Sequence, residues 1–289
     1  MILSIWLSER SLTYFDLHFT TSLTPNPRHS LNYGIQKKKG SEIMVNEKVK
    51  ACINLHAVLR NMEDLCELDK EAHDIIQGKN VAIRFSVKGV PAAILTFSGG
   101  KCTMKKTESR DCHMNLFFNS PGHFNLMIEG KKNPIPTKGF GYIGFLKKDF
   151  TRLADRLSYY LKPTHDLLQN KNFARVNTIL TAYTAFFAIP EIANYDPLGK
   201  LNASRIADGT INVEIDQGPA IHITAENGRL ETAKGKAPNA QAFMLFDSIE
   251  TASGILNGTL DSYCCIGTGQ LAIRGLVPMI DNLNKILAQ

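Results

Sequence analysis

The sequence lacks the short motifs that mark most catalytic and metal sites. Its 289 residues contain no C-x-x-C pair and no H-E-x-x-H, G-x-S-x-G or P-loop pattern, which argues against zinc ribbons, zinc proteases, α/β-hydrolases and P-loop enzymes. Gly139-x-Gly141 and Gly267-x-Gly269 lack the third glycine of a dinucleotide loop and precede expected strands rather than helices. We therefore expect no catalytic residues, no cofactor and no bound metal.

The chain also has little excess of one charge sign over the other. Lys and Arg number 33 against 27 Asp and Glu, a formal charge of +6. A dedicated DNA-binding protein concentrates a larger basic excess, so we expect no nucleic-acid partner. The excess is uneven, because residues 44–163 hold nineteen basic and twelve acidic residues while residues 164–289 hold nine and twelve.

Long apolar runs are missing from the chain start. Residues 1–7 are mostly apolar, but the stretch lacks the basic segment that opens a signal peptide. Glu9 and Arg10 end it after seven residues, and no small-residue cleavage site follows. We therefore expect no signal peptide and a cytoplasmic location. Residues 176–190 are uncharged but too short to span a bilayer, which favours a buried helix over one that touches a membrane.

Residues 1–43 differ in pattern from the rest. Residues 38–42, Lys-Lys-Gly-Ser-Glu, can be encoded by a purine-rich stretch that looks like a bacterial ribosome-binding site just before Met44. Our hypothesis is that residues 1–43 are a non-native, untranslated leader of a bacterial gene and that the true start is Met44. A genuine disordered tail is the alternative.

The cysteines follow no metal-binding or redox spacing. They are Cys52, Cys66, Cys102, Cys112, Cys264 and Cys265. We expect them to be small buried hydrophobes in a reducing compartment, with Cys264 and Cys265 on opposite faces of a strand.

Hydrophobic periodicity indicates a series of short strands and helices. Alternation predicts strands at residues 81–87, 93–97, 102–104, 114–118 and 142–145. A short helix starts at Pro121 behind the N-cap Ser120 and ends at Gly130, and a closing helix follows the last strand.

The same order of elements recurs 128 residues later. Seven identities align at this shift over residues 100–161, and five of them are glycines or the capping serine, at positions where backbone geometry dictates the residue. We predict an α+β chain with two tandem modules, residues 44–163 and 164–289. Each is a small, mainly antiparallel sheet covered by helices.

The second copy resembles the sterol carrier protein 2 (SCP2) family over residues 244–287. The resemblance is carried by Leu256-Asn257-Gly258-Thr259-Leu260, which reads Leu-x-Gly-x-Leu, and by the Gly-x-Leu-x-Ile-x-Gly strand at residues 269–275. The turns at residues 216–219 and 226–228 are also similar. The first copy is matched mainly through the repeat, with Lys147 where Gly275 stands and Lys131-Lys132 in place of Thr259-Leu260.

The resemblance implies an apolar tunnel that carries a fatty acid, a fatty acyl-CoA or a sterol or isoprenoid-like lipid, without catalysis. In the second copy we expect it to be lined by Phe243, Leu245, Ile255, Leu256, Leu260, Leu271, Ile273, Met279 and Leu283, with an opening near residues 277–283. In the first copy the candidates are Leu116, Phe118, Phe124, Met127, Ile143 and Phe145. Alternation does not distinguish a tunnel from a filled core, so a packed core is the alternative for each residue.

Lysines of the first copy are a second candidate contact with a lipid. They are Lys101, Lys105, Lys106, Lys131, Lys132, Lys138, Lys147 and Lys148. They would make transient contact with an anionic membrane or with CoA phosphates, or simply form a solvated face.

Two other functions remain open. One is a protein-interaction or accessory module that has lost lipid binding, since SCP2-like domains also occur as enzyme appendages and as accessory factors in isoprenoid-quinone synthesis. The other is an enzyme that uses Cys264 or one of the scattered histidines.

Overall fold

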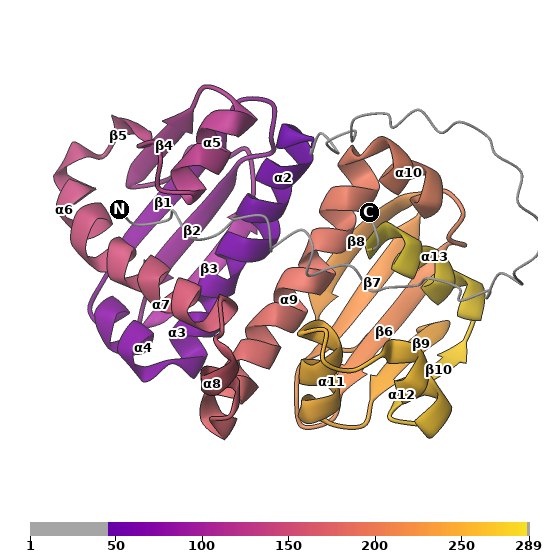
Figure 1. The fold of residues 1–289 in the computed structure, drawn as a ribbon. Helices are drawn as coiled ribbons and strands as arrows, with labels where there is room; N and C mark the ends of the chain where they lie inside the picture. Colours follow the sequence, from indigo (N-terminus) through magenta and orange to yellow (C-terminus); the bar gives the residue numbers. More distant parts are fainter. Residues whose placement is uncertain (1–45, 288–289) are drawn as a thin grey trace, which may run out of the picture.

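The computed structural model describes residues 46–287, which form two five-stranded sheets with helices on one side (Figure 1). The hypothesis of a leader at residues 1–43 therefore lies outside the described residues.

The first sheet has the strand order β3-β2-β1-β4-β5. Its strands are β1 (Val81–Val87), β2 (Ala93–Ser98), β3 (Lys101–Lys106), β4 (Met114–Phe118) and β5 (Ile135–Lys138). Strands β1 and β4 run parallel and the other neighbours are antiparallel. The helices of this module are α2 (Glu47–Ile53), α3 (Met62–Leu68), α4 (Lys70–Ile76), α5 (Pro121–Ile128), α6 (Ile143–Phe145) and α7 (Thr151–Leu161).

The second sheet repeats this topology as β10-β9-β6-β7-β8, with β6 parallel to β9. Its strands are β6 (Gly209–Ile215), β7 (Ala220–Glu226), β8 (Arg229–Lys234), β9 (Ala242–Phe246) and β10 (Leu271–Gly275). Its helices are α9 (Lys171–Tyr195), α10 (Pro197–Ala203), α11 (Ile249–Leu256), α12 (Ser262–Thr268) and α13 (Val277–Leu287), while α8 (His165–Leu168) precedes α9. We call residues 46–161 module 1 and residues 171–287 module 2.

The structure confirms the α+β fold class and the repeat. Strands β1, β3 and β4 and helix α5 reappear as β6, β8, β9 and α11 with their bounds moved by 128 residues. The repeat also extends upstream, because α9 and α10 occupy the places that α2, α3 and α4 hold in module 1.

The fifth strand of module 1 was predicted at the wrong place. Residues 142–145 are helical, and the strand is β5, which ends one residue before Gly139. Gly139 has φ +83°, and a Cβ there would lie 2.2 Å from the carbonyl oxygen of His113. Gly275 meets the carbonyl oxygen of Gln241 in the same way, at 2.0 Å, so Gly139 rather than Lys147 is its counterpart. In module 2 the helix α12 precedes the fifth strand, whereas in module 1 a longer helical run follows the fifth strand. Aligning the two copies at a constant shift of 128 residues therefore matches Lys147, instead of Gly139, to Gly275.

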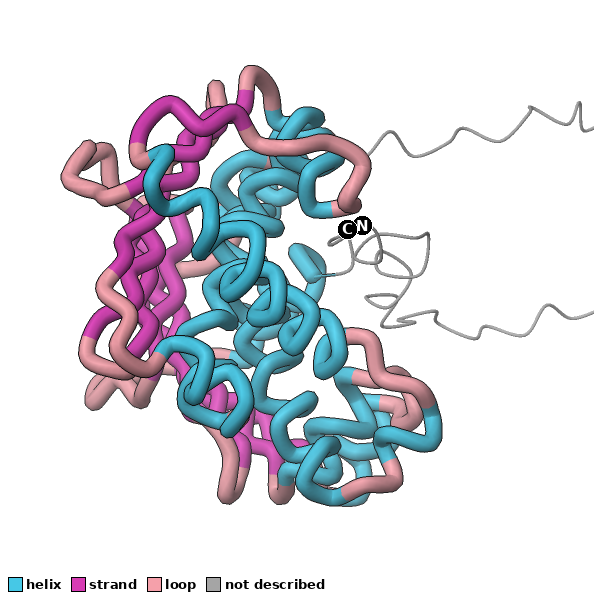
Figure 2. The backbone as a smooth tube through the Cα atoms, turned by 90° about the vertical axis from the view of Figure 1, so that its left-hand side faces the viewer, coloured by secondary structure: helices cyan, strands magenta, loops and turns pink. Residues whose placement is uncertain are grey.

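The helices cover one face of each sheet, as Figure 2 shows for module 1. Side chains of alternate strand positions point to this face, so Ile83, Phe85, Leu116 and Phe118 enter the core of module 1. The buried Arg84 points to the other face, where its Nε donates to the carbonyl oxygen of Ser109 at 2.9 Å and pins the β3–β4 loop.

Helix α9 lies between the two halves (Figure 1). Phe173 and Leu180 belong to the core of module 1, whereas Phe186 and Ile189 belong to the core of module 2. By length and composition it could cross a membrane, but 72% of its apolar window is buried. The expectation of a buried helix in this segment is thus confirmed.

The prediction of a strand at Cys264 and Cys265 was wrong, because both lie on α12. Cys264 is exposed, while the other five cysteines are buried as expected.

Candidate lipid-binding cavity

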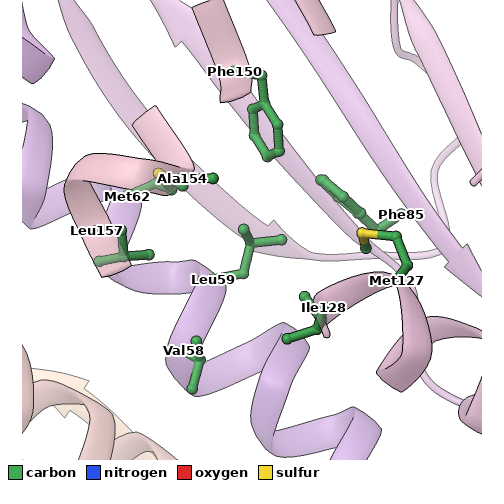
Figure 3. Close-up of a pocket in the computed structure, with 9 residues that line it drawn as sticks. All are labelled: Val58, Leu59, Met62, Phe85, Met127, Ile128, Phe150, Ala154 and Leu157. Carbon is green, nitrogen blue, oxygen red and sulfur yellow. The ribbon is translucent and has the colours of Figure 1, made fainter. Parts of the chain in front are cut away.

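A small, largely enclosed apolar cavity lies in module 1 between the sheet and its helices (Figure 3). Its nine lining residues are Val58, Leu59, Met62, Phe85, Met127, Ile128, Phe150, Ala154 and Leu157. The cavity measures about 20 Å³. That is little more than the space of one water molecule, and an apolar void of this kind stays dry.

Four separate parts of the module form the walls. Phe85 projects from β1, Met127 and Ile128 come from the end of α5, and Phe150 opens the run that continues through α7 (Figure 3). The remaining part, which we call the first wall, is residues 54–62: the irregular helical run and the first residue of α3. It carries Val58, Leu59 and Met62. Two methionines among the lining residues make the cavity adaptable, because an unbranched thioether side chain fills irregular space at low cost.

The helices around the cavity are interrupted where they line it. Asn54–Val58 forms a π-helical turn and Leu59–Asn61 a 3-10 turn, and a further π-helical turn, Leu146–Phe150, ends at the lining residue Phe150. Such turns within a longer helix are frequent at functional sites and hinges. The corresponding helix of module 2, α9, is continuous over 25 residues.

Polar contacts hold the walls together. Asn54 Nδ2 donates to Asn125 Oδ1 at 3.0 Å, which links the first wall to α5. On the other side, Asp69 accepts from the Tyr160 hydroxyl at 2.9 Å and pairs with Arg156, which links α4 to α7. Burial alone would raise the pKa of Asp69, but the bonds from Arg156, Ala72 and Tyr160 outweigh it and lower the pKa. The carboxylate therefore stays charged and the link intact at neutral pH.

The site residues expected from the sequence fall into three groups. Phe118, Phe124, Met127, Leu116, Ile255, Leu271, Met279 and Leu283 are buried between sheet and helices, and Ile143, Phe145, Leu256 and Ile273 are half-buried against those cores. Of all of them, Met127 alone lines the cavity described above.

Three expected residues lie outside the core between the sheet and its helices. Phe243 and Leu245 are half-buried on the opposite face of β9, because Met244 and Phe246 enter the core. Leu260 is 41% exposed and rests over Gly254, whose added Cβ would lie 2.4 Å from Leu260 Cδ1. Phe243 and Leu245 therefore face away from the helices, and Leu260 lies at the surface against α11.

The sequence did not single out the first wall or the closing helix as parts of a site. Val58, Leu59 and Phe150 stand in runs where apolar residues recur at helical spacing. A pattern of apolar residues every three or four positions reports burial, but it carries no signal for a void left between four elements.

The lysines expected to meet a lipid are exposed, but several have protein partners. Lys106 pairs with Glu191 at 3.0 Å and Lys131 with Glu129 at 2.8 Å. Lys138 Nζ donates to the carbonyl oxygen of Cys112 at 2.5 Å.

Metal-binding groups and buried thiols are two potential sources of reactivity within residues 46–287. In this described part no cluster of three His, Cys, Asp or Glu could hold a metal ion. Burial raises the pKa of Cys52 to about 12 and the pKa of Cys102 even further, so these thiols stay protonated and unreactive.

Comparisons with known proteins find similarity among solved structures only, at low scores. No protein-family model and no curated protein matches the chain. Among solved structures, it is similar to a "UbiJ-SCP2 Ubiquinone synthesis protein" at 13% identity and a TM-score of 0.29, covering 35% of this chain and 82% of that one. It is also similar to palmitated SCP2L2 from Aedes aegypti at 16% identity and a TM-score of 0.28, covering 40% and 96%.

An enzyme also matches in part. The sec-alkylsulfatase Pisa1 from Pseudomonas sp. is 18% identical with a TM-score of 0.24, and the match covers 52% of this chain but 29% of the enzyme. At such low scores the fold assignment rests on the strand order and motifs of this chain.

Proposed function

We propose that the protein is a non-enzymatic carrier that holds the hydrocarbon part of a lipid between the sheet and the helices of module 1. The observation that carries this proposal is the largely enclosed cavity whose nine lining residues are all apolar. The SCP2-like motifs lie in module 2, and they support the proposal for module 1 through the topology that the two modules share. A fatty acid, a fatty acyl-CoA and a sterol or isoprenoid-like lipid all fit this chemistry, because the walls offer no polar partner.

Binding requires the cavity to widen. Pockets for small molecules measure roughly 300–1,000 Å³, far above the 20 Å³ of the closed state. Each methylene group that leaves water contributes roughly 0.8 kcal/mol, so a long chain can offset the cost of moving a helix. The interrupted helices around the cavity provide places where such a movement is least costly.

The test combines lipid extraction with a filled-cavity variant. Ala154→Leu places three further carbon atoms in the cavity and should weaken the binding of a fluorescent fatty acid by about tenfold or more, since they occupy space that the ligand needs. Ala272→Leu adds the same atoms to a half-exposed position of β10 and serves as the control. Absence of lipid in the purified protein, together with no binding of the fluorescent fatty acid, would refute the proposal.

A second candidate is an interaction module that no longer binds lipid. The small volume of the cavity favours it, because the core of module 1 is nearly filled as it stands. In that case Ala154→Leu would overpack a void of about 20 Å³ and lower the stability of the fold, and no fatty-acid binding would be seen in the wild type or in the variant.

A further inference from the structure

The first wall of the cavity is also the surface on which module 2 packs. Val58, Leu59 and Met62 face the cavity. The intervening Asn61 points the other way, and its Nδ2 donates to Thr184 Oγ1 of α9 at 2.5 Å. The Arg60 guanidinium lies 4.4 Å from the ring centroid of Phe187 on the same helix. One short run of chain therefore serves both as a cavity wall and as an interface between modules.

An ion-pair cluster closes the same interface. Lys234 Nζ, at the end of β8, lies 3.0 Å from Glu63 Oε2 and 2.8 Å from Asp64 Oδ1, directly after the lining residue Met62. The two carboxylates are nearly buried, with side chains 14% and 11% exposed, so solvent screens the cluster weakly. Burial opposes the charge of Lys234, but these carboxylates outweigh it and raise the pKa of the amine.

The interface is reciprocal. Lys106 of module 1 pairs with Glu191 of module 2 at 3.0 Å. Lys106 stands 128 positions before Lys234, and Glu191 stands 128 positions after Glu63, so this pair is the counterpart of the Lys234–Glu63 pair. Two equivalent surfaces that contact each other in this way form an isologous interface, as in a symmetric dimer. The reciprocity shows that the same Lys–Glu contact fixes both modules at equivalent places.

The two sides of this interface differ in regularity. In module 2 most of the contact is made by α9, which is helical over 25 residues and contains Pro190, whereas in module 1 it is made by the π-helical and 3-10 turns at Asn54–Val58 and Leu59–Asn61 and by the start of α3. The irregular side is thus the one that can change its position. Its outer face is restrained by α9 and Lys234, and its inner face lines the cavity.

We propose that module 2 regulates ligand binding in module 1, because the contacts of α9 and Lys234 hold the first wall in its closed position. This inference rests on the proposed function for its ligand, although the mechanical coupling does not. A ligand that displaces the wall works against these contacts. By linkage, filling the cavity then weakens the interface, and weakening the interface favours filling the cavity.

The variant Lys234→Met tests the coupling, with Lys236→Met as the matched control. Lys236 pairs with Glu214 within module 2 and is 63% exposed. Lys234→Met should raise the affinity for a fluorescent fatty acid on the order of fivefold, whereas Lys236→Met should leave it unchanged. Unchanged or weaker binding in Lys234→Met would overturn the coupling.

Hydrogen exchange provides a readout that needs no ligand. In Lys234→Met, amides of residues 54–65 should exchange faster than in Lys236→Met, because the wall has lost its outer restraint. Thr184→Val removes the hydroxyl partner of Asn61 at nearly constant volume and should have the same effect if Lys234→Met does not fold. Faster exchange in a protein that binds no fatty acid would refute the proposed function alone, while equal exchange in both lysine variants would refute the coupling.

Discussion

At the scale of single residues, the buried His56 makes the fold sensitive to acid. Burial lowers the pKa of His56 to about 3, and its Nε2 lies 3.1 Å from the carbonyl oxygen of Pro91. An unfolded histidine takes up a proton near pH 6.5, so the unfolded state binds more protons below that value and stability is lost as the pH falls.

The variant His56→Gln tests this pH dependence. As the pH falls from about 6.5 to about 4.5, this histidine lowers the free energy of unfolding by about 2 kcal/mol. His56→Gln keeps a donor for Pro91 but does not titrate, so urea unfolding at the two pH values should show a correspondingly smaller loss. An equal loss in variant and wild type would contradict the prediction.

Gly275 illustrates a second residue-scale constraint. It has φ +79° and lies against the carbonyl oxygen of Gln241, whereas Gly258 has φ +70° and open space around it. Gly275→Ala should therefore cost several kcal/mol, and Gly258→Ala should cost about 1–2 kcal/mol from the left-handed backbone alone. Denaturant midpoints of the two variants measure the difference, and equal midpoints would show that the close approach relaxes freely.

At the scale of elements, the start of α4 is tied to α7. Asp69 caps α4 by accepting from the amide of Ala72 at 2.8 Å, and the same carboxylate pairs with Arg156. Asp69→Ala removes the cap and leaves the guanidinium without this partner, which should lower stability by about 3 kcal/mol. Asp74→Ala, at an exposed position on the same helix, is the control for chemical denaturation. A loss as small as that of the control would show that the link adds nothing.

At the scale of the whole molecule, α9 makes the two modules interdependent. It supplies Leu180 to one core and Phe186 to the other, so neither core is complete without it. We expect a single calorimetric unfolding transition, with equal calorimetric and van't Hoff enthalpies. Two resolved transitions in the wild type would show that the modules unfold separately.

The sequence by itself determined the class of fold and its duplication. Glycines with positive φ, such as Gly130 and Gly258, and the caps Ser120 and Ser248 are dictated by local backbone geometry, so they mark the repeat directly. The apolar positions of the strands likewise predicted most of the sheet.

Local patterns were insufficient where two arrangements satisfy them equally. The run from Phe243 to Phe246 is apolar throughout, so only pairing with neighbouring strands decided that Met244 faces the helices. Residues 142–145 suit a strand or a helix, and the pairing of β5 with β4 decided for a helix.

Only the tertiary structure decided where the cavity lies. A void exists where side chains from β1, α5, α7 and the first wall fail to meet, and no single segment encodes that distance. The coupling of this wall to Lys234 is equally non-local, because it joins residues 171 positions apart in sequence. The amino-acid sequence determined which side chains are apolar or charged, whereas the packing of distant elements determined which of them share a site.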